Sequence, residues 1–337
     1  MSKDTNIISQ SAILENAEQH LNGINNNKTT VGLFEKLKAN EAMQLALKQP
    51  DPVYLYPDLI PEAEFTICFG DPGAGKTLFC FNAANEIAND GNIVLYFDLE
   101  LSMKQFQKRY TNDQGNYITF ADTLFRIDYA NLDEFPKDIS YEDYFFSSLL
   151  QLVDQTNAKV IVIDNLTKVA AASTDQARDS IPMLEKLNKL KKKKQLTIIV
   201  LEHCRKSDPA SQITLNHLQG SRMKANLCDN VFAIGKSGKN KNFRYIKQLK
   251  CRSGELVFDA ENVKLFELSK DSGFLKFVHV GYTNEDEHLM SISGKEKQEN
   301  IQLAMQMKEE GKSNVEIGKD LGVSEGTIRN WLRIRNS

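Results

Sequence analysis

One stretch decides the fold: Phe65-Thr66-Ile67-Cys68-Phe69-Gly70-Asp71-Pro72-Gly73-Ala74-Gly75-Lys76-Thr77. Its apolar first half predicts a strand, its second half fits the pattern G-x-x-x-x-G-K-S/T, and residues 78–88 predict a helix. This context is typical of a phosphate-binding loop, whose backbone N–H groups point at phosphate oxygens. The alternative is a tight glycine turn without a ligand. We expect a nucleoside triphosphate to be bound by Gly70, Asp71, Pro72, Gly73, Ala74, Gly75, Lys76, Thr77 and Leu78.

The composition indicates an intracellular protein of several parts. A chain of 337 residues suggests about two domains, and its net charge of −3 means that any nucleic-acid-binding surface must be local. The five cysteines are scattered without a C-x-x-C pair, so neither a disulfide framework nor a zinc site is expected. Residues 1–49 lack the apolar core of a signal peptide, and no run approaches the ~20 apolar residues of a membrane span. We expect a cytoplasmic protein without a membrane partner.

Three further apolar runs, 92–100, 158–165 and 196–203, each end in polar residues. Continuous apolar runs separated by helices predict an α/β fold, in which a parallel sheet is covered by helices on both faces. In such sheets, ligands bind at the carboxyl ends of the strands. Gly70, Glu100, Asp164 and His203 all stand at such ends. Their convergence favours an ATPase.

Each polar strand end has a candidate chemical role. Lys76 would reach the β- and γ-phosphates, and Asp164, placed like a Walker B aspartate, would bind Mg²⁺ or its water shell together with the Thr77 hydroxyl. Glu100 is the candidate general base for the attacking water, and His203 is the candidate sensor of the γ-phosphate. The alternatives are that Glu100 only caps the next helix and that His203 is structural.

These motifs, in this order, resemble the RecA/DnaB superfamily of ring-forming ATPases, near the RepA-type hexameric plasmid helicases, over about residues 57–268. Residues 94–102 are similar to the DnaB-type segment with the catalytic glutamate, although Asp98 replaces a serine. Glu202 stands where the RepA branch carries the first of two histidines, so that motif is half matched. The resemblance implies a RecA-like sheet, ATP and Mg²⁺ as cofactors, DNA as a partner, and a homo-oligomer, most simply a hexameric ring.

Two basic residues, Lys250 and Arg252, form another part of the resemblance. Lys250-Cys251-Arg252-Ser253-Gly254 resembles the DnaB motif Lys-x-Arg-x-Gly, whose cations reach into the ATP site of the next subunit. Two residues apart on a predicted strand, Lys250 and Arg252 would project from one face and could stabilise charge on the γ-phosphoryl group. The alternative is a solvated charged strand face. The first interpretation makes the active site shared between subunits.

Residues 205–219 form a predicted polar loop after His203, in which Lys206 is the candidate contact to DNA phosphates. The loop has no aromatic residue to stack on bases, which weakens a claim of single-strand binding. The run Lys191–Lys194 is interpreted as a solvated helix end that complements the helix dipole, rather than as a nucleic-acid patch.

The carboxyl end predicts a small all-α helix-turn-helix domain. Helices are expected over 295–310, after Ser313 and after Ser324, with Gly322 in the turn. Residues 315–328 are similar to resolvase- and regulator-type helix-turn-helix sequences, except that Gly318 stands where alanine is preferred. A protein-binding bundle is the alternative. The residues expected to face DNA are Ser324, Thr327, Arg329, Asn330 and Arg333.

Four segments are therefore expected: a helical arm and linker over 1–56, a RecA-like ATPase domain over 57–283, a linker over 284–294, and a helix-turn-helix domain over 295–337. The leading function is an ATP-hydrolysing DNA-binding motor, a ring helicase or DNA-remodelling ATPase in the replication of a mobile element. The alternatives are an ATP-switched DNA-binding regulator or loader without strand translocation, and an ATPase whose carboxyl-terminal bundle binds protein.

Overall fold

The computed structural model describes residues 29–31, 34–51, 53–130, 138–166, 169, 180–205, 208–219, 221–270, 273–289 and 294–333. The chain divides into two units, residues 1–52 and 53–337. In the first unit, strands β1 (Thr29–Val31) and β2 (Phe34–Lys36) pair antiparallel and precede helix α2 (Ala39–Ala46). The predicted arm is thus helical in part only, since residues 34–36 form a strand.

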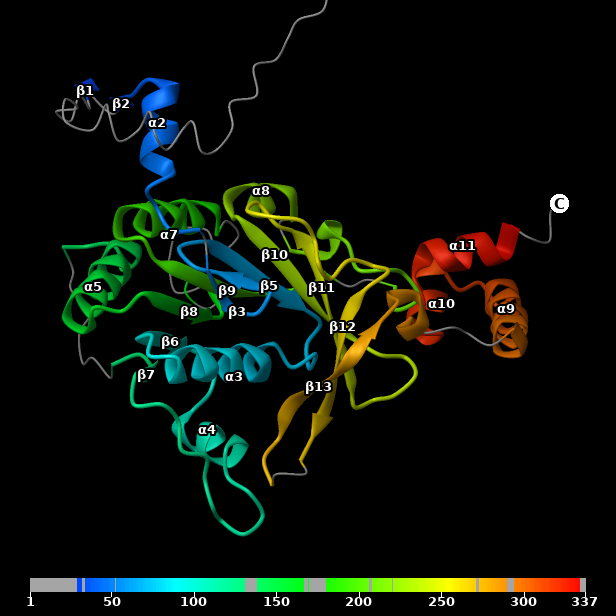
Figure 1. Ribbon diagram of the computed structural model, residues 1–337. Coiled ribbons are helices and arrows are strands. Elements are labelled where there is room, and N and C mark those ends of the chain that lie inside the picture. Colours follow the sequence, from blue (N-terminus) through cyan, green and yellow to red (C-terminus); the bar gives the residue numbers. More distant parts are fainter. Residues whose placement is uncertain are drawn as a thin grey trace, which may run out of the picture. The chain divides into compact units, whose positions relative to one another are not determined.

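The second unit is built on a nine-stranded mixed sheet with the order β13-β12-β11-β10-β5-β9-β8-β6-β7 (Figure 1). The neighbours from β10 to β7 run parallel, as predicted. The three strands beyond β10 are antiparallel, so the prediction of a purely parallel sheet was too simple. In sheet order, the strands are β13 (Lys276–Thr283), β12 (Val263–Ser269), β11 (Phe243–Lys250), β10 (Asn230–Lys236), β5 (Phe65–Gly70), β9 (Thr197–His203), β8 (Val160–Asp164), β6 (Val94–Asp98) and β7 (Leu124–Ile127).

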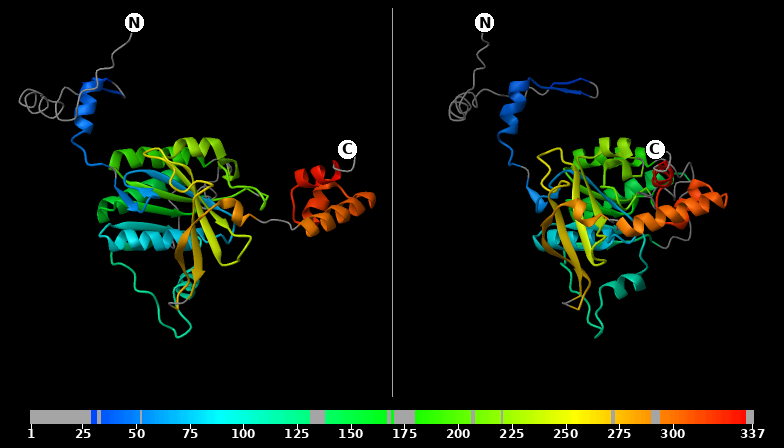
Figure 2. Two further views of the ribbon diagram at one scale, coloured as in Figure 1. Left: turned by 45° about the vertical axis from the view of Figure 1, so that its right-hand side comes forward. Right: turned by 90° about the vertical axis from the view of Figure 1, so that its right-hand side faces the viewer.

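Helices cover both faces of this sheet, as the views in Figures 1 and 2 show. Helices α3 (Lys76–Asn89) and α4 (Met103–Arg109) lie on one face, and α5 (Tyr141–Thr156), α7 (Ile181–Lys194) and α8 (Ser221–Leu227) on the other. Strand alternation divides the core accordingly, because Cys68 packs in the first hydrophobic cluster and its neighbours Ile67 and Phe69 in the second. A short antiparallel pair, β3 (Tyr54–Tyr56) and β4 (Ile60–Pro61), precedes β5.

The predicted linker over 284–294 differs from the structure at its start. Residues Glu285–His288 form the 3₁₀ helix η2, in which Glu285 and His288 are buried. Lys247 Nζ forms an ion pair with Glu285, and Ile213 N donates to the same carboxylate at 2.8 Å. The predicted linker thus begins with a carboxylate, Glu285, that is paired within the fold.

The carboxyl-terminal residues form three helices, α9 (Gly294–Glu309), α10 (Asn314–Asp320) and α11 (Glu325–Arg333), close to the predicted bounds. Their small core contains Ala304, Ile317, Ile328 and Trp331. Gly318 stands at a tight approach, where an added Cβ would lie 2.8 Å from the Val323 carbonyl oxygen. This contact explains why glycine stands at a position where the helix-turn-helix sequences that this segment resembles prefer alanine. Within the part of the chain that the structure describes, no helix is long and apolar enough to cross a bilayer.

Candidate active site

The phosphate loop joins β5 to α3 at the carboxyl ends of the parallel strands. Gly73 and Gly75 have φ of 72° and 97°, a left-handed conformation that favours glycine. A Cβ at Gly70 would lie 2.5 Å from the Ile234 carbonyl oxygen, so β10 approaches too closely for any other residue. Lys76 Nζ donates to Gly70 O at 2.8 Å and to Asp71 O at 3.3 Å, which keeps the ammonium group beside the loop.

Thr77 and Asp164 lie together, as a shared magnesium site requires. Their side chains are hydrogen-bonded, and Tyr96 Oη donates to Asp164 Oδ2 at 2.9 Å. Burial raises the pKa of the Asp164 carboxyl to about 6, although the hydrogen bonds from Thr77 and Tyr96 lower it. A carboxylate and a hydroxyl are hard oxygen ligands, and Mg²⁺ commonly takes one or two of them with phosphate oxygens and water. The two residues therefore fit Mg²⁺, whereas the described residues include no cluster of three His, Cys, Asp or Glu for a metal held by protein alone.

Glu100, Asn165 and His203 meet from three neighbouring strand ends. Asn165 Nδ2 donates to Glu100 Oε1 and lies 3.2 Å from His203 Nε2. The candidate base and the candidate sensor, predicted separately, are thus joined by a buried residue that sequence reasoning missed. Its signal was its place directly after Asp164 at the carboxyl end of β8.

Glu202, the departure from the RepA pattern, does not join this group. It is buried, and Lys224 Nζ of α8 lies 2.6 Å from its Oε1. Burial raises the pKa of the Glu202 carboxyl, although the charge of Lys224 lowers it. Its strand neighbour His203 contacts Asn165 instead, as the alternation of side chains along β9 requires.

Two cations beside the loop were also missed. Lys236 Nζ donates to Pro72 O at 2.6 Å, and Arg244 donates through Nε to Ala74 O at 3.1 Å. Both side chains donate hydrogen bonds to carbonyl oxygens of the phosphate loop. They therefore stabilise its curled backbone from the side of β10 and β11. The available signal was Lys236 itself, a basic residue at the carboxyl end of an apolar run that proves to be a parallel strand.

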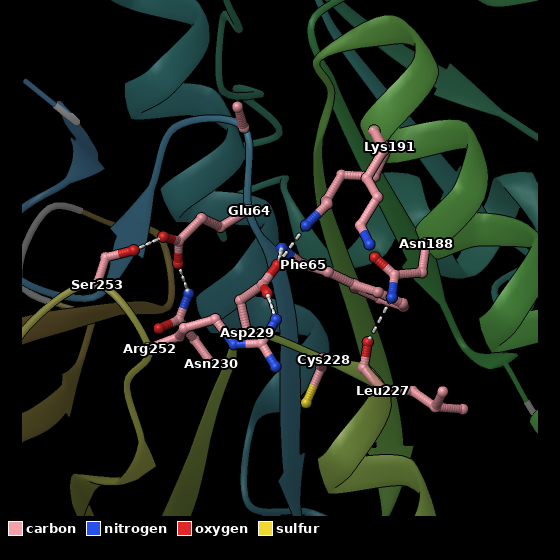
Figure 3. Close-up of polar contacts among 12 residues, drawn as sticks. Glu64, Phe65, Asn188, Lys191, Leu227, Cys228, Asp229, Asn230, Arg252 and Ser253 are labelled. Atoms are coloured by element: carbon pink, nitrogen blue, oxygen red, sulfur yellow. Dashed lines mark hydrogen bonds and ion pairs between the residues drawn. The ribbon is translucent and has the colours of Figure 1, made fainter. Parts of the chain in front are cut away.

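Lys250 and Arg252 lie at the opposite edge of the sheet from the phosphate loop of their own subunit. Lys250 Nζ donates to Ala225 O and Cys228 O, each at 2.7 Å, and Arg252 Nη1 lies 2.9 Å from Asp229 Oδ1. Figure 3 shows Arg252 and Lys191 on either side of Asp229. Because β11 ends at Lys250, only one of the two cations is on the strand, and the predicted common strand face is not formed.

Lys191 corrects the interpretation of the lysine run. It is buried, and its Nζ lies 2.5 Å from Asp229 Oδ2, which also accepts from Phe65 N at 3.0 Å. Although burial raises it, these two bonds hold the pKa of the Asp229 carboxyl below its ordinary value. Lys192 and Lys193 are exposed, as predicted. Asp229, a buried acid just before β10, forms an ion pair with Lys191, the first lysine of the run. The sequence could not show this pairing.

The candidate DNA contacts are described in part. Lys206 and the side chain of Arg333 lie outside the described residues. Ser324 caps α11 by accepting from Thr327 N at 3.1 Å, and Arg329 Nη2 lies 2.5 Å from Glu325 Oε1. Ser324, Arg329 and Asn330 are exposed. In the predicted polar loop, Gln212 donates to Asp286 Oδ1 at 2.7 Å and His217 Nδ1 accepts from Thr214 N at 3.2 Å, so both are engaged within the chain.

The parallel-dominated sheet, the glycine loop and the polar strand ends define a P-loop ATPase with a RecA-like fold. Residues 34–209, slightly more than half of the chain, match the family described as AAA domain, and the chain belongs to this family.

A solved structure and two known sequences agree with this class. The structure, an ATPase domain, is similar in fold with a TM-score of 0.54 and 15% sequence identity, over 72% of this chain and 99% of that chain. Two proteins named DNA repair protein RadA, from Chlamydia muridarum (strain MoPn / Nigg) and Chlamydia trachomatis serovar D, are each 24% identical, over 62% and 60% of this chain. The chain spans 42% and 41% of the length of these two relatives.

Proposed function

We propose that this protein hydrolyses ATP and uses the cycle to move or remodel DNA, as a ring-forming motor of the RepA/DnaB type in the replication of a mobile element. The observation that best supports hydrolysis is the arrangement at the carboxyl edge of the sheet, where Lys76, Thr77 and Asp164 adjoin the group made by Glu100, Asn165 and His203.

This edge offers each part that phosphoryl transfer to water needs. The loop N–H groups and Lys76 bind the phosphates. Thr77 and Asp164 would hold Mg²⁺, which supplies positive charge to the β- and γ-phosphate oxygens. Glu100 orients the attacking water and accepts its proton. His203, at the end of β9, responds to the presence of the γ-phosphate.

The positions of Lys250 and Arg252 support the proposal of an active site shared between subunits. At the far edge of the sheet they serve no ATP of their own subunit, but a neighbour in a ring could receive them. Held beside its γ-phosphoryl group, they would stabilise the charge of the transition state. We therefore propose a homo-oligomer, with a hexameric ring as the simplest form.

The DNA part of the proposal draws support from two sides. The RadA relatives are named as DNA repair proteins. The carboxyl-terminal helices have the capped, glycine-turned form of a helix-turn-helix, with Ser324, Thr327, Arg329, Asn330 and Arg333 as candidate contacts. Lys206 is the candidate phosphate contact of the core.

The test is ATP hydrolysis by the full chain, with and without forked DNA, beside Lys76→Ala. Lys76 is half-buried and bonded only to loop carbonyls among the described contacts, so its loss should leave folding intact and abolish hydrolysis. Normal turnover by this variant would remove the ATPase proposal. Displacement of a strand from the fork identifies the motor.

One observation favours a second candidate, an ATP-switched DNA-binding regulator or loader. Gln212 and Ile213 of the loop after β9 are bonded to Asp286 and Glu285 of η2, a few residues before the carboxyl-terminal helices. A change at His203 could thus reach η2 without any movement along a strand. Hydrolysis with DNA-dependent rates but no strand displacement would support this candidate.

A further inference from the structure

We propose that Asn165 is a positioning residue that couples the base Glu100 to the sensor His203 through the two hydrogens of one side-chain amide. The inference rests on the proposed ATP hydrolysis, and it assigns a role to a residue to which the sequence analysis gave none.

The contact with Glu100 fixes the orientation of the amide. An ionised carboxylate only accepts hydrogen bonds, so the amide atom beside Glu100 Oε1 is the nitrogen Nδ2. The same Nδ2 lies 3.2 Å from His203 Nε2, and its second hydrogen is directed there. His203 Nε2 therefore accepts, which makes the imidazole neutral with its proton on Nδ1.

The position of Asn165 makes these two bonds costly to give up. Its side chain is 2% exposed, at the end of β8, which lies between β6 and β9 in the sheet. A buried amide hydrogen that loses its acceptor lowers the stability of the folded protein. If either Glu100 or His203 turns away, the amide gives up one of these two contacts. The orientations of the base and the sensor are therefore linked energetically.

This link has a chemical consequence. His203 cannot donate from Nε2 to a γ-phosphate while Nε2 accepts from Asn165. Donation requires a proton on Nε2 and ends the contact between His203 and the amide, while the contact between the amide and Glu100 remains. The state of the phosphate at His203 is thereby conveyed to the carboxylate that orients the attacking water.

The first test compares Asn165→Ala with Asn230→Ala in steady-state hydrolysis across pH. Asn230 is a matched control, because it is also a buried asparagine whose Nδ2 contacts a glutamate, Glu64, but at the opposite edge of the sheet. We expect Asn165→Ala to lower kcat by about 10–100-fold, as loss of residues that orient catalytic ligands does, with KM for ATP nearly unchanged. Removing a donor also raises the pKa of a carboxylate, so the acid limb of its kcat profile should move up by about one pH unit.

The control should change neither kcat nor the acid limb. An unshifted limb in Asn165→Ala, or an equal loss of kcat in Asn230→Ala, would overturn the positioning role. Asn165→Ser, which keeps one hydrogen-bond donor, should recover part of kcat and serves if the alanine variant does not fold.

The second test needs no turnover. The measurement is nitrogen NMR of histidine-labelled protein, with the His203 signals assigned by their absence in His203→Gln. In the unaltered chain, the ring proton of His203 should be on Nδ1. In Asn165→Ala, it should no longer prefer Nδ1 over Nε2. A His203 with its proton on Nε2 in an active enzyme would overturn the inference alone. An unaltered chain that does not hydrolyse ATP, whatever the tautomer, would overturn the proposed function and with it the coupling of base and sensor.

Discussion

Asp164, the proposed Mg²⁺ ligand, makes the folded protein less stable at neutral pH than a neutral side chain would. Burial raises the pKa of its carboxyl from 3.8 to about 6. Between these pH values the folded protein holds a proton that the unfolded chain has released, so unfolding becomes easier as pH rises. The stabilising contribution of the protonated form is complete below pH 3.8 and is lost as pH rises through about 6. A shift of this size corresponds to about 3 kcal/mol at neutral pH.

The substitution Asp164→Asn should therefore stabilise the protein while inactivating it. The amide keeps the shape of the side chain without a charge, so without nucleotide and Mg²⁺ it should raise the free energy of unfolding at about pH 7.5 by up to about 3 kcal/mol and have little effect near pH 4. Urea unfolding at both pH values measures this difference. Asp154→Asn, at a half-exposed residue paired with Lys194, is the control and should change stability by about 1 kcal/mol or less. Equal destabilisation by Asp164→Asn at both pH values would contradict the cause given for the raised pKa.

At the scale of residues, some members of the candidate site could be predicted from the sequence and others could not. Lys76 and Thr77 follow from a motif whose spacing fixes their geometry, and the structure brings Thr77 to Asp164. Asn165 and Arg244 have no such spacing, because their partners come from other strands and meet them only after folding. Local patterns reveal side chains that act with sequence neighbours, but not those defined by contacts across the sheet.

At the scale of elements, two glycines of the carboxyl-terminal helices should respond to alanine in opposite ways, one with lower and one with higher stability. Gly318→Ala should destabilise that unit, because its Cβ would lie 2.8 Å from a backbone oxygen that cannot easily move. Gly326→Ala should stabilise it by up to about 1 kcal/mol, since its Cβ meets only the Ser324 hydroxyl oxygen at 3.7 Å and alanine favours helix.

Trp331 provides the measurement for both variants. It is the single tryptophan of the chain and is buried in the three-helix core, so its fluorescence reports the unfolding of this unit within the full protein. A lower midpoint for Gly318→Ala and a higher one for Gly326→Ala are expected. A shift of the same sign in both would contradict the close packing of α10 on the turn before α11.

Strands β11 to β13 show why a third of the nine-stranded sheet was harder to predict. β11 carries Arg244, Lys247 and Gln248, polar side chains that interrupt its apolar pattern, yet all three are buried. Each is buried with a partner: Arg244 on the loop carbonyls, Lys247 on Glu285, and Gln248 on Asp58 O. Continuous apolar runs predicted four of the six parallel strands, β5, β6, β8 and β9, whereas these pairings arise only in the folded chain.

At the scale of the whole molecule, the two candidate DNA-facing regions should differ in what they recognise. Removal of residues 291–337 should erase preference among duplex sequences and leave ATP hydrolysis largely intact, because the nucleotide-site residues lie elsewhere.

Two point variants should separate base contacts from phosphate contacts. Arg333→Ala should relax the preference among sequences by roughly 1–3 kcal/mol if it contacts a guanine. Lys206→Ala should weaken binding equally for all sequences and make binding less dependent on salt. Affinity for a selected duplex and for scrambled controls, at two salt concentrations, measures these effects. Equal discrimination by the truncated protein would contradict the helix-turn-helix assignment.

The proposal of an active site shared between subunits predicts recovery of activity when two inactive variants are mixed. Arg252→Ala should fold, since Asp229 keeps its bonds from Lys191 and Phe65 N, but it should not hydrolyse ATP. Glu100→Gln should be inactive for lack of a base. In a mixed ring, some interfaces pair the intact Glu100 of one subunit with the intact Arg252 of the next, about a quarter of them at equal proportions. Hydrolysis should therefore return toward about a quarter of the normal rate, and exposed Lys192→Ala, as the control, should be active by itself. If mixed oligomers form, as native mass spectrometry would show, and no ratio of the two variants restores hydrolysis, each subunit must complete its own site.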